Sequence, residues 1–533
     1  MNTLRTHLDA WAAILEECGI SHWVYSPGSR NAPLLAALMR RPYFHLFEQI
    51  DERSAAYMAL GMAQQLNYPC GVLCTSGTAA ANWLAAASEA FYQRIPLLLV
   101  SADRPIEALD NWMGQTIRQD GLFHRHVRGE WRMPDTLDAL EQTPILEDLM
   151  HEAITRSQHP IAGPVHINFP LREPLYQDME NPAAQAYHPK PYVWSKPNPE
   201  PVNVERLEQT LKPYSRIALV LGQMNPHADR KPALGALNDR IAVWADVCSQ
   251  NQSDSSGSWE RLMHQFEQWP DALRPDLLLT MGLSNLPKSL HKALRHLNLP
   301  HWHISPENEI GNPFGTALEH LCHYEVDFLA ALDACLPHDR SFGSQWRQAS
   351  SASKPLEGKR PNEYAEAQRL LESVPSDAVL HLGNSMPIRY ASWFGSLNCE
   401  VRSNRGTSGI DGCLSASIGA ALANPQQRHF LLLGDVSFIY DQHGLWANPR
   451  PENLTIWVLN NRGGRIFEQI DGPGNWVDLQ QRISSPHQVN LQALCQQYGV
   501  AYLRCSASEY TTGGAPNPGL HVVEIPCYDS LTS

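Results

Sequence analysis

The stretch 428–467, RHFLLLGDVSFIYDQHGLWANPRPENLTIWVLNNRGGRIF, contains two apolar runs that each end in polar residues. The first run ends in Gly434 and Asp435, and the second ends in Asn460 and Asn461. Asp435 and Asn461 are 26 residues apart, about the length of one strand–helix–strand crossover. Because the carboxyl ends of parallel strands meet at one edge of a sheet, this spacing predicts that a carboxylate and a carboxamide lie close together.

Such a pair of side chains has two interpretations. Carboxylate, amide and main-chain carbonyl oxygens are the ligands that Mg²⁺ prefers, and Gly463 can supply the last of these. Asp and Asn are also common after strands simply because they cap helices and form turns. The pair alone therefore leaves turn chemistry open as the alternative to a metal site.

The rest of the chain repeats the pattern of a short apolar run, a Gly, Ser or Asn turn, and a helix. The predicted strands are 22–26, 71–75, 96–102, 163–170, 216–222, 241–247, 276–282, 301–305, 378–383, 428–435, 454–461 and 521–526. Continuous apolar strands alternating with helices indicate parallel sheets covered on both faces. We therefore predict an α/β protein of three doubly wound domains, 1–180, 200–340 and 360–533. A Pro- and Asn-rich segment (174–201) and a polar segment (339–360) are predicted to be linkers.

The overall composition excludes several classes of protein. Lys and Arg number 41 and Asp and Glu 55, so the net charge of −14 argues against a nucleic-acid partner. The eleven Cys form no CxxC pair, which disfavours a zinc ribbon or a disulfide scaffold. The first 20 residues carry acids rather than a basic leader, and no run of 18 apolar residues occurs, so we expect a cytoplasmic protein without a membrane span.

The strand-end spacing, together with the three-domain order, resembles the thiamine-diphosphate-dependent enzymes. The resemblance implies a pyrimidine-binding first domain, a middle domain, and a last domain that binds the diphosphate and Mg²⁺ or Mn²⁺. It makes Asp435 and Asn461 metal ligands through their side chains and Gly463 a ligand through its carbonyl. Val436 stands where these enzymes usually have Gly, which leaves the metal ligands intact.

The same resemblance assigns a role to Glu52, in the segment FEQIDERSAAYMALGMA. A Glu between a strand end and a helix there contacts the aminopyrimidine ring of the cofactor and promotes formation of the thiazolium nucleophile. That role requires a carboxyl group with a raised pKa beside an apolar ring. Taken without the resemblance, Asp51 and Glu52 would simply favour a helix N-terminus.

Longer motifs narrow the resemblance. SPGSRNAPL (26–34), GNSMPIR (383–389), SNRGTSGIDG (403–412) and NNRGGRIF (460–467) resemble the 2-succinyl-5-enolpyruvyl-6-hydroxy-3-cyclohexene-1-carboxylate synthase family of menaquinone biosynthesis. The resemblance implies a thiamine-diphosphate-dependent transferase. It would decarboxylate 2-oxoglutarate and add the resulting succinyl-semialdehyde carbanion to isochorismate in a Stetter-like 1,4-addition.

Both implied substrates are dicarboxylates, which guanidinium groups bind through paired hydrogen bonds. The residues implied to bind their carboxylates are Arg30, Arg104, Lys288, Arg389 and Arg405. Those implied to act in catalysis are Glu52, Ser29, Arg30, Gln115, Ser385, Arg389 and Arg405. Those implied to contact the cofactor are Glu52, Gly77, Thr78, Gly383, Asn384, Ser385, Ile410, Gly434, Val436, Ser437, Ile466 and Phe467.

The sequence departs from the family pattern at one further position, and several of the named residues also have ordinary structural roles. Gly114 replaces an Asn that the family usually has, so one substrate hydrogen bond is lost or replaced. Surface ion pairs are the ordinary role of Arg, and core packing is the ordinary role of Ile466 and Phe467. Lys288 offers a point charge rather than a guanidinium fork.

Two other functions stay open at this point. One is a decarboxylase or acetohydroxyacid-type ligase that uses the same cofactor on pyruvate and has little need for four arginines. The other is a non-catalytic protein of the same fold, which the presence of Glu52 disfavours. The resemblance also implies a homodimer or dimer of dimers, with small-molecule substrates bound at active sites on the subunit interface.

Overall fold

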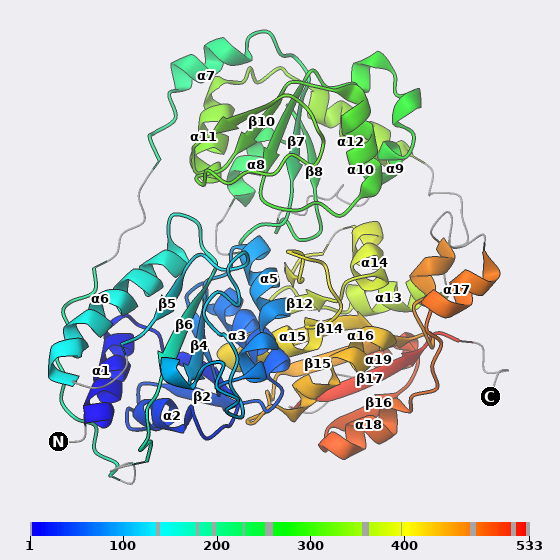
Figure 1. The fold of residues 1–533 in the computed structure, drawn as a ribbon. Helices are drawn as coiled ribbons and strands as arrows, with labels where there is room; N and C mark the ends of the chain where they lie inside the picture. Colours follow the sequence, from blue (N-terminus) through cyan, green and yellow to red (C-terminus); the bar gives the residue numbers. More distant parts are fainter. Residues whose placement is uncertain are drawn as a thin grey trace.

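The computed structural model describes residues 3–134, 139–176, 181–193, 199–226, 230–250, 259–353, 362–395, 397–469, 476–512 and 519–528. It contains three parallel sheets, each with helices on both faces, arranged as a triangle with the middle sheet at the apex (Figure 1). The predicted class of three doubly wound α/β units is confirmed. No helix within the described residues is long and apolar enough to cross a bilayer.

The first sheet has the strand order β2-β1-β3-β4-β6-β5. Its strands are β1 (His22–Tyr25), β2 (His45–Glu48), β3 (Cys70–Cys74), β4 (Leu97–Asp103), β5 (Glu130–Arg132) and β6 (Pro164–Pro170). Its helices are α1 (Thr3–Glu17), α2 (Ala32–Met39), α3 (Glu52–Leu66), α4 (Thr78–Ala81), α5 (Leu84–Gln93), the 3₁₀ turn η1 (Ile106–Ala108) and α6 (Ala139–Gln158). β4 and β6 are fully buried, as expected for the centre of a parallel sheet.

The middle sheet has the order β11-β10-β9-β7-β8. Its strands are β7 (Ile217–Leu221), β8 (Ala242–Ala245), β9 (Leu277–Met281), β10 (His301–Ile304) and β11 (Leu318–Leu321). Its helices are α7 (Val204–Leu211), α8 (Lys231–Leu237), α9 (Trp259–Met263), η2 (Phe266–Gln268), η3 (Asp271–Leu273), α10 (Lys288–Leu297), α11 (Glu325–Cys335) and α12 (Phe342–Ala352).

The third sheet has the order β13-β12-β14-β15-β17-β16. Its strands are β12 (Val379–Leu382), β13 (Glu400–Arg402), β14 (His429–Gly434), β15 (Leu454–Asn460), β16 (Ala501–Arg504) and β17 (His521–Pro526). Its helices are α13 (Asn362–Glu372), α14 (Met386–Phe394), α15 (Cys413–Ala423), α16 (Asp435–Tyr440), η4 (Gln442–Trp446), η5 (Arg465–Gln469), α17 (Val477–Ile483), α18 (Leu491–Tyr498) and α19 (Ala507–Thr512).

One hydrophobic core joins the first and third sheets through the pair α3 and α15. A Cβ atom on Gly61 would lie 1.9 Å from the carbonyl oxygen of Ala416, and one on Gly419 would lie 2.0 Å from that of Met58. Both contacts are too short for any side chain, so the two glycines allow the helix backbones to touch. The two sheets are therefore held together by a close helix crossing within one chain.

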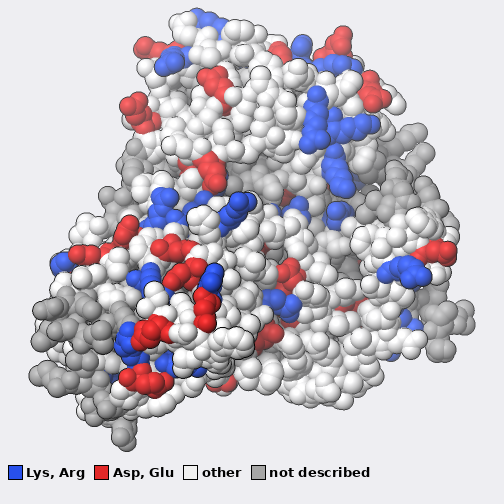
Figure 2. All heavy atoms as spheres, in the orientation of Figure 1, with Lys and Arg blue, Asp and Glu red and all other residues white. Residues whose placement is uncertain are grey.

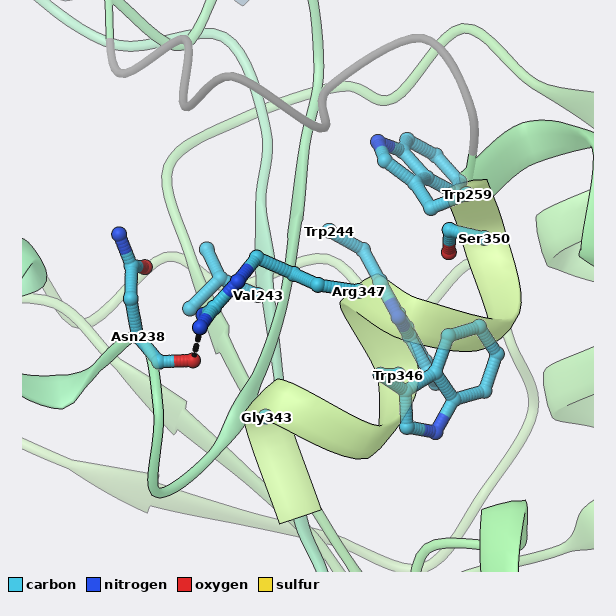
Figure 3. Close-up of a pocket in the computed structure, with 8 residues that line it drawn as sticks. All are labelled: Asn238, Val243, Trp244, Trp259, Gly343, Trp346, Arg347 and Ser350. Carbon is cyan, nitrogen blue, oxygen red and sulfur yellow. Dashed lines mark hydrogen bonds between the residues drawn. The ribbon is translucent and has the colours of Figure 1, made fainter. Parts of the chain in front are cut away.

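The segment 339–360 was predicted to be a linker, and this prediction is wrong for residues 342–352. They form α12, because Phe342 and Trp346 are one helical turn apart and both pack into the middle core. Trp346 meets Trp244 edge to face with ring centroids 4.9 Å apart. Figure 3 shows these rings with Trp259 around a cavity of about 10 Å³, which is room for no more than one water molecule.

The segment predicted to link the first and middle domains does not hang free over 181–193. It has no helix or strand there, but its backbone is held by side chains of the first domain. The amide of Gln185 donates to Asp9 at 2.9 Å, and the hydroxyl of Tyr187 donates to Glu147 at 3.0 Å. The domain boundaries themselves stay a prediction.

Candidate active site

A cavity of about 330 Å³ opens at the carboxyl ends of the third sheet. This is the edge at which open parallel sheets bind their ligands. The lining residues come from the loops after β12, β13, β14 and β15, with additions from α13 and α17. They are Glu363, Asn384, Ser385, Met386, Pro387, Ile410, Gly434, Asp435, Val436, Ser437, Leu459, Asn461, Gly463, Gly464, Arg465, Ile466, Phe467, Ile483, Ser484 and Ser485.

Asp435 lies at the start of α16, directly after β14, and is 2 % exposed. One carboxylate oxygen accepts the amide of Val436 at 2.8 Å. The other accepts the amide of Gly463 at 3.0 Å and Nε2 of His487 at 3.1 Å. Burial raises the pKa of Asp435, while His487 and the two amides oppose that shift. The carboxylate is thus fixed against the loop that carries Gly463.

Asn461 supplies the second polar group. Its amide nitrogen donates to Glu363 at 2.6 Å, which turns its oxygen away from Glu363. That oxygen is buried and has no hydrogen-bond partner among the described residues. A buried, unpartnered carbonyl oxygen is costly unless a ligand completes it. Asp435 and Asn461 therefore contribute a carboxylate and an amide oxygen to the lining of one cavity.

These groups fit a hard divalent cation. Within the described residues, no cluster of three His, Cys, Asp or Glu side chains could hold a metal. A cation here would be shared among one carboxylate, one amide oxygen and a main-chain carbonyl, which is typical of Mg²⁺ bound with a diphosphate. Gly463 has φ 155°, and a Cβ atom there would lie 2.8 Å from the carbonyl oxygen of Ser484, so only Gly fits that position.

The remaining lining residues form an apolar wall and a helix start. Val436, Ile410, Ile466 and Phe467 surround the polar end, and the carbonyl of Ile410 accepts the hydroxyl of Ser437 at 2.9 Å. α14 begins at the cavity with Met386, but Pro387 has no N–H and the amide of Ile388 donates to the carbonyl of Gly383 at 3.2 Å, so in the first turn only the Met386 amide is available to a ligand. A ligand with an anionic end and an apolar ring system fits this arrangement.

Of the residues predicted to contact the cofactor, eight line this cavity: Asn384, Ser385, Ile410, Gly434, Val436, Ser437, Ile466 and Phe467. Gly383 lies behind it, against Leu433 of β14. Glu52, Gly77 and Thr78 belong to the first sheet and do not line it.

Glu52 is the first residue of α3, where Asp51 caps the helix by accepting the amide of Ser54 at 2.9 Å. The Glu52 carboxylate accepts a long hydrogen bond of 3.4 Å from the side chain of Asn82 and interacts with its own backbone amide. Burial raises the pKa of Glu52, and the charge of Asp51 adds to that shift. Glu52 is thus a half-buried carboxyl group with the raised pKa that its predicted role requires.

The other first-domain candidates gather at the carboxyl ends of β1 and β4. Arg30 is buried; it donates to the carbonyl of Leu171 at 2.8 Å and pairs with Glu173 at 3.0 Å. Its pKa is lowered by burial and by the nearby charge of Arg104. Arg104 in turn donates to the carbonyl of Gly114 at 3.1 Å. The two arginines therefore lie in one region of the first domain.

Ser29 and Gln115 are exposed beside this pair. The carbonyl of Ser29 accepts the hydroxyl of Tyr176 at 3.0 Å, and the carbonyl of Gln115 accepts that of Ser76 at 3.0 Å. Gln115 has φ 56°, a conformation that few side chains adopt. These two hydrogen bonds use only the backbone carbonyls of Ser29 and Gln115. The side chains of both residues stay exposed at the edge of the first sheet.

Arg389 and Arg405 form a second pair, at the end of β13 and on α14. Arg405 donates to the side-chain oxygen of Asn384 at 3.1 Å, and Arg389 donates to the carbonyl of Ser385. Burial lowers the pKa of Arg389, and the charge of Arg405 lowers it further. Asn384 and Ser385 line the cavity, so both arginines stand directly behind its wall.

The residues of the middle domain that lie beside this second pair are Glu260 and Ser284, not Lys288. Glu260 accepts the hydroxyl of Ser392, one turn beyond Arg389, at 2.9 Å. Burial raises the pKa of Glu260 to about 7, and Arg389 opposes the shift. Ser284 donates to the carbonyl of Arg405 at 3.1 Å. Lys288 is exposed at the start of α10 and does not line the cavity.

Several site residues had no sequence signal that would have identified them. Glu363 lies on α13 and His487 in a loop, and neither follows a strand of the sheet. Ser484 and Ser485 precede Pro486, which is an ordinary turn signal, and their loop folds back until Gly464 donates to the carbonyl of Ser484 at 2.7 Å. Only the tertiary fold brings these segments to the cavity.

The charged side chains are unevenly distributed on the face of the molecule that Figure 2 draws. Figure 2 shows acidic and basic groups interspersed over the first domain, and few charges over the third. The net charge of −14 is thus not concentrated at the cavity, which holds only three charged residues in its lining: Glu363, Asp435 and Arg465.

Three parallel α/β domains, with a cavity at the strand ends of the last one whose polar and apolar lining fits a cation and a diphosphate, are the arrangement of the thiamine-diphosphate-dependent enzymes. Residues 5–122 match the family model described as the thiamine pyrophosphate enzyme N-terminal binding domain. The match covers β1 to β4 and the loop that carries Gln115, so the first domain is of this class as well.

Curated relatives match over nearly the whole chain. Proteins named 2-succinyl-5-enolpyruvyl-6-hydroxy-3-cyclohexene-1-carboxylate synthase are similar in Desulfotalea psychrophila (34% identical, 92% of each chain), Cytophaga hutchinsonii (32%, 92% of this chain and 90% of the relative) and Bacteroides thetaiotaomicron (33%, 93% and 90%). The chain belongs to this synthase family, so it is an enzyme, a transferase that uses thiamine diphosphate.

Proposed function

We propose that the protein catalyses the reaction of its family: removal of CO₂ from 2-oxoglutarate and 1,4-addition of the remaining succinyl unit to the ring alkene of isochorismate. The product would be 2-succinyl-5-enolpyruvyl-6-hydroxy-3-cyclohexene-1-carboxylate, an intermediate of menaquinone biosynthesis. The observation that carries the proposal is the third-domain cavity, whose lining combines Asp435 and Asn461, with its unpartnered side-chain oxygen, with an apolar wall.

When bound, thiamine diphosphate supplies the nucleophilic carbon and the electron sink that such a decarboxylation needs. Asp435, Asn461 and Gly463 would hold Mg²⁺ or Mn²⁺, and the Met386 amide at the start of α14 and the hydroxyl of Ser385 would donate to the anionic end of the cofactor. Ile410, Ile466 and Phe467 would pack against its rings and exclude water.

Glu52 would hold a proton toward the ring nitrogen of the aminopyrimidine. Its raised pKa keeps the carboxyl group protonated nearer to neutral pH than an exposed Glu, which suits proton exchange with a ring nitrogen. Glu52 does not line the third-domain cavity of its own chain. This arrangement supports a homodimer, or a dimer of dimers, in which the Glu52 of one subunit meets the cofactor held by another.

The two arginine pairs would bind the substrates. 2-Oxoglutarate and isochorismate together carry four carboxylates, and Arg30 with Arg104, and Arg389 with Arg405, offer four guanidinium groups on two surfaces. Ser29, Gln115 and Ser385 would add hydrogen bonds. Lys288 would join them only if its exposed side chain reached the site, and Ser284 holds the better position beside Arg405.

All eleven cysteines are free thiols, which suits the reducing cytoplasm where we propose that the enzyme works. In the cytoplasm the enzyme would bind both small substrates, 2-oxoglutarate and isochorismate, from solution.

The deciding experiment incubates the protein with 2-oxoglutarate, isochorismate, thiamine diphosphate and Mg²⁺ and follows the loss of isochorismate. We expect isochorismate and 2-oxoglutarate to be consumed in equal amounts. The control replaces 2-oxoglutarate with pyruvate, which lacks the distal carboxylate. Turnover of pyruvate without consumption of isochorismate would identify a decarboxylase or acetohydroxyacid-type ligase and overturn the proposal.

A further inference from the structure

The backbone on both sides of Glu52 is fixed to a segment of the third domain in the same chain. Before it, Glu48 and Asn448 exchange backbone hydrogen bonds of 2.8 and 2.9 Å. The side chain of Gln49 is fully buried and donates to the carbonyl of His443 at 2.9 Å, while its oxygen accepts the amide of Asp51 at 3.2 Å. The approach to α3 is thus held by residues 443–448.

Asp51 links the two sides directly. Its first carboxylate oxygen caps α3 by accepting the amide of Ser54, and its second accepts Nδ1 of His443 at 2.7 Å. Burial would raise the pKa of Asp51, but the hydrogen bonds from Ser54 and His443 outweigh it and lower the pKa. Asp51 is therefore a charged cap with a fixed orientation.

The residue after Glu52 is held in the same way. Arg53 donates to the carbonyl of Tyr440 at 2.9 Å, and its guanidinium lies 4.7 Å from the centroid of the Tyr440 ring. Asp441 follows Tyr440; it is fully buried and accepts the amide and the hydroxyl of Ser415 at 2.7 Å each. The segment that holds Arg53 is therefore itself anchored in the core.

Glu52 stands between these fixed neighbours, and its carboxylate is held weakly, by the 3.4 Å contact to Asn82 and by its own backbone amide. A rigid backbone with a nearly free carboxyl group is what a residue needs when its partner is a bound ligand. We propose that His443 and Asp51 are positioning residues for Glu52: their hydrogen bond fixes the start of α3, and with it the direction of the Glu52 carboxyl group. This inference rests on the proposed function, in which Glu52 acts on the cofactor.

His443 is the group to alter, because its ring is 45% exposed and its removal leaves no buried void. In His443→Ala the donor to Asp51 is lost, while the backbone carbonyl that binds Gln49 stays. In His443→Asn the side-chain amide can take the place of Nδ1 and donate to Asp51, so this variant is the matched control.

The first measurement is exchange of the thiazolium C2 proton of bound thiamine diphosphate with solvent deuterium, in the presence of Mg²⁺ and without substrates. We expect His443→Ala to slow this exchange and kcat by about ten- to a hundredfold, because misplacement of a reacting group by about 1 Å has that effect. Affinities for Mg²⁺ and the cofactor, KM values and Tm should stay near those of the unaltered enzyme. His443→Asn should restore most of the rate.

Normal exchange and kcat in His443→Ala would overturn the proposal. So would a loss of rate that is matched by losses of cofactor affinity and Tm, or one that His443→Asn does not restore, since either indicates a merely structural contact. Glu52→Gln separates the two levels of inference. If its exchange is as fast as that of the unaltered enzyme, the proposed role of Glu52 fails; if its exchange is slow while that of His443→Ala is normal, only the positioning role fails.

Discussion

The first and third domains have the same strand order but differ in the side chains at the carboxyl ends of their strands. Numbered within each domain, the strands of both sheets follow the order 2-1-3-4-6-5. In the third domain the strand ends leave a cavity with an unpartnered amide oxygen at Asn461. In the first, the ends of β4 and β6 are closed by their own side chains: Gln119 donates to Asn168 at 2.9 Å, and Asn168 donates to Asp103 at 2.8 Å.

The difference shows that the sheet sets where a ligand can bind and the loops decide whether one does. A satisfied carboxamide network fills the first edge, so that domain offers groups at its rim, above all Glu52. At the third edge the side-chain oxygen of Asn461 has no partner among the described residues, which would let it bind the proposed cation. If this division is correct, substitutions in the third domain remove binding, and substitutions in the first remove turnover.

The largest effect should follow from Asp435→Asn. Loss of this carboxylate should weaken Mg²⁺ and cofactor binding by more than about a hundredfold, because even outer-shell partners of a metal typically contribute ten- to a hundredfold. Binding of Mn²⁺, followed by electron paramagnetic resonance, measures the effect without substrates. Retained Mn²⁺ affinity would place the cation elsewhere.

Glu52→Gln tests the other half of the division. We expect kcat to fall by about 10²- to 10⁴-fold, the usual contribution of a general acid or base. Affinity for Mg²⁺ and thiamine diphosphate should change little, because Glu52 does not line the cavity. Titration calorimetry beside steady-state kinetics checks both. A parallel loss of cofactor affinity would contradict the division.

Glu363→Gln should give a smaller effect within the third domain. Glu363 accepts the amide of Asn461 and so turns the Asn461 oxygen away from itself, which leaves it available to the proposed cation. A neutral Gln can present its own NH₂ to Asn461 and turn that amide, so Mn²⁺ affinity should fall by about ten- to a hundredfold. The matched control is Glu366→Gln on the same helix, which lies outside the cavity lining.

The third-domain arginines also differ from the first-domain pair in their partners. Arg30 pairs with Glu173 of its own domain, whereas Arg389 faces Glu260 of the middle domain. The pKa of Glu260 is raised from 4.5 to about 7, so its contribution to stability is complete below pH 4.5 and is lost as the pH rises through 7.

Glu260→Gln should remove that loss. From pH 5 to pH 8 the free energy of unfolding of the unaltered enzyme should fall by up to about 3 kcal/mol more than that of the variant, since 1.36 kcal/mol corresponds to one pKa unit. Tm measured at both pH values checks the prediction. An equal change of Tm with pH in both proteins would show that Glu260 ionises normally.

The smallest effect should follow from substitutions at the crossing of α3 and α15, and it should be the same for either helix. Gly61→Ala and Gly419→Ala each place a Cβ atom against a backbone carbonyl of the facing helix. Each should destabilise by about 1–3 kcal/mol, as overpacking typically does. Gly235→Ala is the control, because a Cβ atom there meets nothing within 4 Å. Unequal losses of Tm would mean that the crossing is not equivalent from both sides.

The sequence predicted the centre of each sheet well and its margins poorly. The predicted ranges for the inner strands agree with the structure to within a residue or two, because fully buried strands are continuous apolar runs. No range was predicted for β2, β5, β11, β13 and β16, and all five are edge strands; the predicted range 241–247 found the remaining edge strand, β8. The residues of β16 are mostly exposed, so they lack the apolar run that identifies a strand.

The same contrast holds for the site. Asp435 and Asn461 were predictable because they follow inner strands, where position along the chain fixes position in space. Glu363 and His487 were not, because each reaches the cavity from an element whose placement depends on tertiary packing. Helix α12 was missed for a related reason: its two large apolar residues are surrounded by Ser and Gln.

The crossing of α3 and α15 has one further consequence. Gly61 meets Ala416 while Gly419 meets Met58, and each glycine is three residues beyond the residue that receives the other's contact. Reciprocity of this kind is the mark of a two-fold axis, which ordinarily relates identical chains. Here it relates two segments of different sequence inside one polypeptide, so the shape of the crossing is shared although its residues are not. A change that damages one helix can therefore be repaired by a change in the other, and the two segments should vary as a pair among related enzymes.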